Sequence, residues 1–271
     1  MRLHDLPEQS VPLPWHEESW AHLTRQFGQG QLPHALMLQG PPGVGKAQFA
    51  LAAARLLLCA SPRDGLNCGE CHGCRLSAAG NNGDLRWVQP DAMDESPAPK
   101  SDKARRSRVI RIEQVRDAIV FTQGTASFGA RQVAVFAPAD RLNVNGYNAL
   151  LKSLEEPAGD TFLLLVCDRV HGVPATIRSR CQALRLPAPA REVALQWLQG
   201  ITGDEADSAQ LLELAGGSPL LAAALFHSGE SEDLALRQQA LRALFSGRVS
   251  ADQVWQSWSD SEPGEFLDQF S

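Results

Sequence analysis

The stretch His34-Ala-Leu-Met-Leu-Gln-Gly-Pro-Pro-Gly-Val-Gly-Lys-Ala47 decides the fold of this 271-residue chain. Its first six residues, 34–39, are mostly apolar and predict a short buried strand. After the glycines, residues 47–59 are rich in alanine and leucine and contain no helix breaker, which predicts a helix. A strand, a glycine-rich loop and a helix in this order form a phosphate-binding loop. The predicted fold class is therefore α/β.

The loop fits the pattern G-x-x-x-x-G-K-[S/T] at Gly40, Gly45 and Lys46, with a further glycine at Gly43. In this pattern backbone N–H groups surround the phosphates, the lysine reaches the outer ones, and the final hydroxyl binds Mg²⁺. Ala47 stands at the hydroxyl position, and an alanine side chain cannot ligate a metal. We therefore expect that ATP is not bound productively. Weak binding of phosphate or nucleotide through Lys46 and the backbone stays open.

ATP hydrolysis also needs an acidic pair at the end of a later strand, which holds Mg²⁺ and activates water. The strand predicted at 133–136 is followed by Ala137 and Pro138 instead, and Asp140 lies three residues beyond the usual position. Two alternatives stay open beside a degraded phosphate loop. One is a working ATPase that uses Asp140, and the other is a glycine loop that arose by chance.

Four of the six cysteines, Cys59, Cys68, Cys71 and Cys74, form the pattern C-x₈-C-x₂-C-x₂-C. Four thiolates satisfy tetrahedral Zn²⁺, and the two short gaps let neighbouring thiolates chelate from one tight turn. Such a site has no open position for water, so we expect structural Zn²⁺. An iron–sulfur cluster uses the same ligands and is the alternative. His72 is expected to be a solvated loop residue rather than a ligand.

The rest of the chain divides by pattern into an α/β part and a helical part. Further buried strands are predicted at 162–166 and 183–186, and residues 60–100 are expected to be irregular. Strands that alternate with helices indicate a parallel sheet with helices on both faces. The predicted helices before residue 188 are 17–29, 112–123 and 145–155, and those after it are 191–199, 204–215, 219–227 and 232–246.

Composition narrows the classes of function. The formal net charge is −6, which argues against a general DNA coat or a zinc-dependent nucleic-acid-binding module. No apolar run approaches the roughly 18 residues of a membrane span, and residues 1–15 lack the apolar stretch of a secretory signal. We therefore expect a cytoplasmic protein without a membrane partner.

Two further stretches carry a family resemblance: Asn148-Ala-Leu-Leu-Lys-Ser-Leu-Glu-Glu-Pro157 and Ile177-Arg-Ser-Arg-Cys181. With the phosphate loop and the inserted cysteines, they resemble the bacterial clamp loader subunits of the AAA+ class over residues 10–227. These proteins open the sliding clamp of DNA polymerase III and close it on primed DNA. The resemblance implies an AAA+ P-loop domain at 1–188 with a Zn-binding insertion at 59–74. It further implies a helical lid at 189–229 and the beginning of a helical collar domain at 230–271.

Three departures from the ATP-hydrolysing motor subunits of this family indicate which member the chain resembles. Ala47 replaces their threonine, Ala137-Pro138 replaces their acidic pair, and Leu220 follows Gly217-Ser-Pro219 where they carry a nucleotide-sensing arginine. The resemblance therefore implies a non-hydrolysing stator subunit. The alternative is an ATP-hydrolysing motor subunit of the gamma/tau type.

The motif Ser179-Arg180-Cys181 is intact. In the family its arginine reaches the γ-phosphate of ATP held by a neighbouring motor subunit, so Arg180 is implied to be an arginine finger that acts in trans. Arg178 is the rival candidate. The implied partners are gamma/tau motor subunits and a delta subunit in a hetero-pentamer, which brings the sliding clamp and primer-template DNA to the assembly.

Overall fold

The computed structural model describes residues 5–93, 107–129, 131–246 and 248–250. The chain divides into two compact units, Met1–Val193 and Ala194–Ser271. We call them the first and the second unit and describe each by itself.

The described part of the first unit contains a five-stranded parallel sheet with the strand order β2-β3-β4-β1-β5. The apolar β1 therefore lies between β4 and β5 and receives hydrogen bonds on both sides, which suits a strand buried on both faces. The strands are β1 Ala35–Gln39, β2 Leu85–Val88, β3 Gln132–Phe136, β4 Thr161–Cys167 and β5 Gln182–Arg185.

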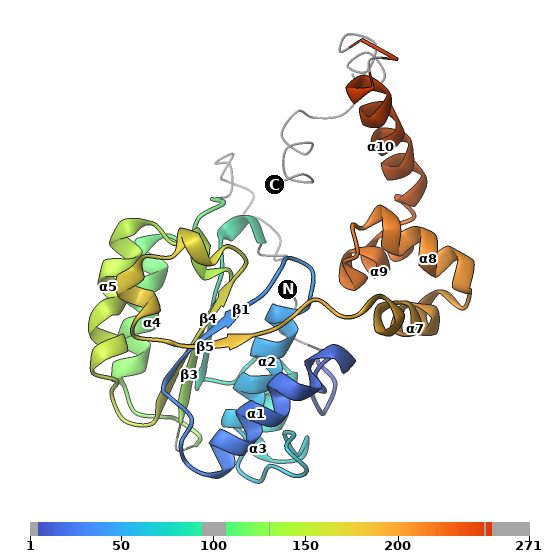
Figure 1. Cartoon of the computed structure of the whole chain (residues 1–271). Coiled ribbons are helices and arrows are strands. Elements are labelled where there is room, and N and C mark those ends of the chain that lie inside the picture. The colour runs from blue at the N-terminus through green and yellow to red at the C-terminus, as the bar shows by residue number, and fades with distance from the viewer. Residues whose placement is uncertain (1–4, 94–106, 130, 247, 251–271) are drawn as a thin grey trace, which may run out of the picture. The chain divides into compact units, whose positions relative to one another are not determined.

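Helices cover both faces of this sheet (Figure 1). Successive strand residues point to opposite faces. Leu36 and Leu38 accordingly pack with Phe49 of α2 in one core, while Met37 packs with Leu150 of α5 in the other. The helices of this unit are α1 Glu17–Gly28, α2 Lys46–Leu57, α3 His72–Ala78, α4 Ile112–Gln123, α5 Val144–Glu155 and α6 Ala175–Arg178. Short 3₁₀ helices lie at Pro14–His16, Asp91–Met93, Ala139–Arg141 and Val170–Gly172.

The expectation that residues 60–100 are irregular is wrong, because α3 and β2 lie within that range. β2 is a four-residue strand that pairs with a neighbour on one side only. Its charged Arg86 interrupts the apolar pattern, so the sequence shows no strand period there. The other strands lie within one residue of their predicted ranges.

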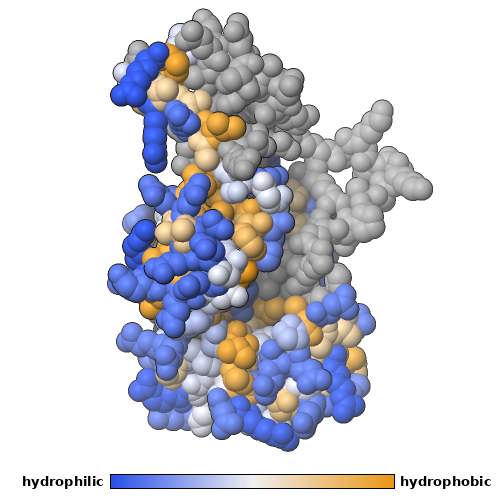
Figure 2. Space-filling model, turned by 90° about the vertical axis from the view of Figure 1, so that its right-hand side faces the viewer, coloured by the Kyte–Doolittle hydropathy of each residue, from blue (hydrophilic) through white to orange (hydrophobic). Residues whose placement is uncertain are grey.

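The second unit is helical in its described part, as the sequence predicts. Its core contains Leu198, Leu211, Leu212 and Ala222, and the side chains of Asp204 and Ser218 cap α8 and α9. Figure 2 draws both units, and the coloured surface on the face it shows is mostly hydrophilic, with apolar side chains scattered between the hydrophilic ones. The helices are α7 Arg191–Thr202, which begins just before the unit boundary, α8 Glu205–Leu214, α9 Pro219–Ser228 and α10 Ser231–Phe245.

The lid at 189–229 and the collar at 230–271 stay predictions, and residues 251–271 of the collar lie outside the described residues. Among the described helices, none taken singly has the length and apolar character to cross a membrane. Only α8 and α9 together pass that test, and they are bent by 109°.

Candidate functional sites at the two edges of the sheet

The phosphate loop connects the carboxyl end of β1 to the start of α2. Gly43 and Gly45 have φ angles of 73° and 92°, in the left-handed region that favours glycine. A Cβ atom on Gly40 would lie 2.2 Å from the carbonyl oxygen of Leu186. These three glycines therefore meet conformational or steric demands of the loop itself.

Lys46 directs its side chain back into this loop. Its Nζ donates to the carbonyl oxygens of Gly40 and Pro41 over 2.8 and 2.6 Å. The same Nζ lies 2.6 Å from Oδ1 of Asp168, and the lysine is only 4% exposed. An ammonium group has three N–H donors. All three are therefore matched by acceptors of the chain's own residues.

Asp168 is a residue of this site that the sequence analysis missed. It follows β4, next to β1 in the sheet, so the parallel arrangement brings it to the same edge as the loop. Its backbone N–H donates to Oδ1 of Asp140 over 3.0 Å. The available signal was an acidic residue directly after a buried parallel strand, where ligand sites of α/β sheets form.

Trp15 and His16 lie against the same loop. The indole Nε1 of Trp15 donates to the carbonyl oxygen of Val44 over 2.8 Å. The His16 ring is fully buried and meets the ring of Phe49 edge to face, with 5.4 Å between centroids. Neither ring nitrogen of His16 has a hydrogen-bond partner among the described residues. Burial lowers the pKa of His16 to about 4, so this imidazole is neutral at pH 7.

The structure brings the four predicted cysteine ligands together. All four Sγ atoms lie within 4.8 Å of one another. The Cys59–Cys71 and Cys68–Cys74 sulfur pairs are 3.9 and 4.0 Å apart. A tetrahedron with metal–sulfur bonds of about 2.3 Å has edges of about 3.8 Å, so the cluster fits one tetrahedral ion. His72 is exposed at the start of α3 and is not one of the clustered groups.

Backbone and side-chain donors surround these sulfurs, as is usual around metal-bound thiolates. The backbone N–H of Cys68 donates to Cys59 Sγ over 3.2 Å, and that of Cys71 donates to Cys68 Sγ over 3.3 Å. Burial acts to raise the pKa of Cys68, but N–H donors from Cys71 and Glu70 hold this pKa at about 6. Donors of this kind favour the thiolate that a metal requires.

The segment 5–10 passes over this cluster and is held there by two buried side chains. Arg55 of α2 is 1% exposed and donates to the carbonyl oxygens of Pro7 and Glu8 over 2.7 and 3.0 Å. Asn67 donates to the Glu8 oxygen over 2.8 Å and to Cys74 Sγ over 3.5 Å. The sequence analysis missed both residues, because neither belongs to a recognisable motif.

Arg180 lies between α6 and β5, at the edge of the sheet where the parallel strands begin. Its Nε donates to Oε1 of Glu155 over 2.7 Å, and its Nη2 forms an ion pair with the same oxygen at 2.5 Å. Its Nη1 donates to the carbonyl oxygen of Thr176 over 2.9 Å. The neighbouring Ser179 is exposed, while Cys181 packs against the core, where burial raises the pKa of its thiol to about 12. The rival candidate Arg178 is exposed at the end of α6.

The structure does not bring Arg180 and the phosphate loop of the same chain together. In the parallel pairing of β1 with β5, Leu36 is opposite Gln182, two residues after Arg180. From Leu36 the strand runs four residues to Gly40, a rise of about 13 Å. The loop therefore lies at the carboxyl edge of the sheet and Arg180 at the amino edge.

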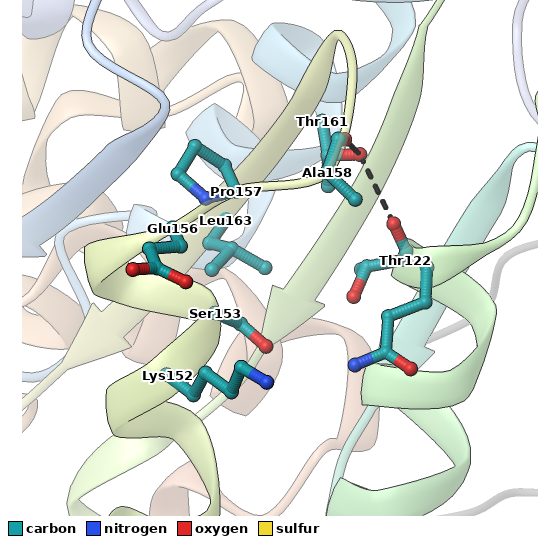
Figure 3. Close-up of a pocket in the computed structure, with 9 residues that line it drawn as sticks. Thr122, Lys152, Ser153, Glu156, Pro157, Ala158, Thr161 and Leu163 are labelled. Atoms are coloured by element: carbon teal, nitrogen blue, oxygen red, sulfur yellow. Dashed lines mark hydrogen bonds between the residues drawn. The ribbon is translucent and has the colours of Figure 1, made fainter.

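A small cavity also lies at the amino edge, between the carboxyl ends of α4 and α5 (Figure 3). Lys152 and Ser153 line it from α5, and Thr122 lines it from α4. Its volume is about 30 Å³, whereas pockets for small molecules measure roughly 300–1,000 Å³. It has room for about one water molecule and is too small for a nucleotide.

Comparison with known proteins identifies the family. The sequence profile described as "DNA polymerase III, delta subunit" matches residues 15–190. The DNA polymerase III subunit delta′ of Pseudomonas aeruginosa is 39% identical over 91% of this chain and 71% of its own length. The chain belongs to the delta-prime family. The Escherichia coli K12 member is 30% identical over 88% of this chain and 67% of its own length.

Membership of the delta-prime family confirms the family resemblance read from the sequence. The parallel sheet, the helices on both of its faces and the loop between β1 and α2 confirm the predicted α/β fold class. A solved structure of a gamma subunit-related protein of DNA polymerase III from Thermotoga maritima is also similar. The two chains are 18% identical, and the alignment covers 93% of this chain and 76% of the Thermotoga maritima chain, with a TM-score of 0.49.

Proposed function

We propose that this chain is a non-hydrolysing stator subunit of the DNA polymerase III clamp loader, located in the cytoplasm. In this role it supplies Arg180 to the ATP site of a neighbouring motor subunit. The observation that carries the proposal is the position of Arg180, which lies at the amino edge of the sheet, away from the chain's own phosphate loop. In this position Arg180 cannot contact a nucleotide in its own loop, so a nucleotide that it contacts has to be held by another chain.

The phosphate loop supports the non-hydrolysing part of the proposal. Ala47 and Ala137 offer no oxygen to Mg²⁺, and Lys46 is already paired with Asp168. A triphosphate would have to displace a carboxylate from Lys46 and would then face the negative charges of both Asp168 and Asp140. Mg²⁺ normally screens such repulsion, and its usual protein ligands are missing here.

The partners follow from the proposed role. They are gamma/tau motor subunits and a delta subunit in a hetero-pentamer, with the sliding clamp and primer-template DNA reached through the assembly. The α/β domain at 1–188, the lid at 189–229 and the start of the collar at 230–271 are the proposed parts of the chain.

The metal proposed at the cysteine cluster is structural Zn²⁺. The sulfur spacing and the closed set of four ligands support it, because zinc in structural sites takes four thiolates in a tetrahedron. The cluster joins the end of α2 to α3, so a bound ion would cross-link the insertion to the helix that begins at the phosphate loop. Metal analysis of protein purified without chelator should find about one zinc per chain. Iron with sulfide would favour the iron–sulfur alternative.

Two assays of ATP hydrolysis test the proposed role. The purified chain with Mg²⁺ and primed DNA should show no turnover. Turnover that disappears in Lys46→Ala would overturn the proposal in favour of a motor subunit. In an assembled loader, Arg180→Ala should slow the neighbouring site by about 10³-fold or more, the range measured for arginine fingers. An unchanged clamp-loading rate would contradict the role given to Arg180, and Arg178→Ala is the matched control.

A further inference from the structure

We propose that Glu155 is a positioning residue for Arg180: its carboxylate holds the guanidinium in the orientation in which it meets the nucleotide of the neighbouring subunit. This inference rests on the proposed role of Arg180 in trans. It adds a second residue of this chain to the reaction, one that acts through Arg180 rather than on the nucleotide.

The contacts of the Arg180 guanidinium group lie along its sides, and the end of the side chain stays accessible. Nε and Nη2 share one edge of the group and both face the same Oε1 of Glu155, Nε through a hydrogen bond and Nη2 through an ion pair. Nη1 donates to the carbonyl oxygen of Thr176 and makes a longer, 3.4 Å contact with Ser179 Oγ. The group has five N–H donors in one plane. Nε, Nη1 and Nη2 each face a residue of this chain, and the second N–H of Nη2 is left at the end of the side chain, where it can meet a phosphate oxygen.

Both partners are anchored in the same core. Leu154, directly before Glu155, is 2% exposed, and Ile177, in the short helix before Arg180, is 0% exposed. Both belong to the hydrophobic cluster between α5 and the sheet, and Cys181 packs against that cluster. A long arginine side chain loses much rotamer freedom when it is held in one geometry. Here the rigid backbone on both sides and the Glu155 contact hold it before any nucleotide arrives.

The ion pair between Arg180 and Glu155 contributes too little to stability to explain why it is present. The side chains of Arg180 and Glu155 are 35% and 50% exposed, and ion pairs with that exposure add little to stability. Glu155 is the last residue of α5, where the helix dipole disfavours a negative charge. The adjacent Glu156 has the same charge and is also exposed, yet the structure places no contact between it and Arg180 among the described residues.

The test uses the loader assembled from this chain and its motor and delta subunits. Pre-steady-state ATP hydrolysis is recorded for wild type and for Arg180→Ala. The phase that differs between the two time courses reports the site completed by this chain. Glu155→Ala should slow that phase by about 10- to 100-fold, the cost of a misplaced reacting group, while the KM for ATP changes less than twofold.

Three variants separate positioning from other effects. Glu155→Gln keeps an oxygen acceptor for Nε and Nη2 without the charge, so it should stay within about threefold of wild type. Glu156→Ala removes the neighbouring charge and should leave the rate unchanged. Glu155→Ala added to Arg180→Ala should cause no further loss, because Glu155 acts only through Arg180. Co-purification of all subunits in normal proportions shows that each variant assembles.

The outcomes distinguish this inference from the proposed function. If Arg180→Ala loses the phase and Glu155→Ala keeps it, the positioning role is wrong and the arginine finger stands. If Arg180→Ala changes nothing, the proposed function fails and the inference fails with it. A further loss from Glu155→Ala in the Arg180→Ala background would mean that Glu155 acts by another route, which also overturns the inference.

Discussion

Gly40 is a residue of the phosphate loop that has no room for a side chain. Its Cβ position is 2.2 Å from the backbone oxygen of Leu186, and backbone cannot move aside as a flexible side chain can. Gly40→Ala should therefore lower the free energy of unfolding by about 2–3 kcal/mol, as overpacking does. Gly28→Ala is the matched control, because nothing lies within 4 Å of its Cβ position. Urea unfolding of both variants checks this, and equal effects would contradict the steric explanation.

His16 should make the stability of the protein depend on pH. Its folded-state pKa of about 4 lies below the ordinary value of 6.5, so the unfolded chain binds a proton first as the pH falls. The stability is fully present above pH 6.5 and is lost between pH 6.5 and pH 4. At pH 5 the loss amounts to about 2 kcal/mol.

His16→Phe keeps an aromatic ring and removes the titration. We expect the change in unfolding free energy from pH 7.5 to pH 5 to be smaller in this variant by about 2 kcal/mol. The packing cost of the substitution is the same at both pH values, so the difference isolates the histidine. Equal pH dependence in wild type and variant would mean that the pKa of His16 is not lowered by folding, so that His16 is protonated at pH 5 in the folded protein as well.

At the scale of elements, one arginine of α2 fastens the segment 5–10 over the cysteine cluster. Arg55→Met removes the donors to Pro7 and Glu8, so the Pro7 carbonyl oxygen loses its donor and the Glu8 oxygen keeps only the one from Asn67. We expect the segment to open more often, at a local cost of roughly 1–3 kcal/mol. A glutamate-specific protease should then cut after Glu8 about tenfold faster or more, since each 1.4 kcal/mol raises the open population tenfold.

Arg63→Met is the matched control for this experiment. Arg63 pairs with Glu70 at the surface, where the two side chains are 62% and 69% exposed. Its loss should leave the cleavage rate after Glu8 unchanged. Faster cleavage in both variants would point to a general effect of lost positive charge rather than to the contacts of Arg55.

At the scale of the whole molecule, each hydrophobic core formed by the described residues belongs to one unit. Within the part of the chain that the structure describes, the two cores of the sheet end at Leu186, and the core of the second unit begins at Ala194. Burial of apolar area within a unit therefore supplies most of that unit's stability. A fragment of residues 1–193 should melt within about 3 °C of the sheet-containing unit of the full chain, a shift of about 1 kcal/mol. A midpoint lower by more than about 6 °C would show that the first unit depends on the second.

Strongly patterned elements were predictable from the sequence, and weakly patterned ones were not. β1, β3 and β4 are continuous apolar runs, whose burial on both faces shows directly in composition. β2 was missed because a short strand at the edge of a sheet carries no such run. The cysteine cluster was predictable because its four cysteines lie close together in the chain, whereas Arg55 and Asn67 act through contacts with distant segments.

The sequence by itself determined the glycine loop with Lys46 and Ala47, the clustering of the four cysteines, the α/β class and the family. All of these depend on residue types at short, fixed spacing, and local geometry translates such spacing directly into structure. Only the tertiary structure decided that Lys46 pairs with Asp168, that Glu155 holds Arg180, and that Arg180 lies at the edge opposite its own loop. These arrangements depend on strand order and helix packing, which place residues side by side that are far apart in the chain. The physical reason is that the stable packing buries apolar area from the whole chain at once. A single stretch of sequence therefore does not determine which distant residues meet.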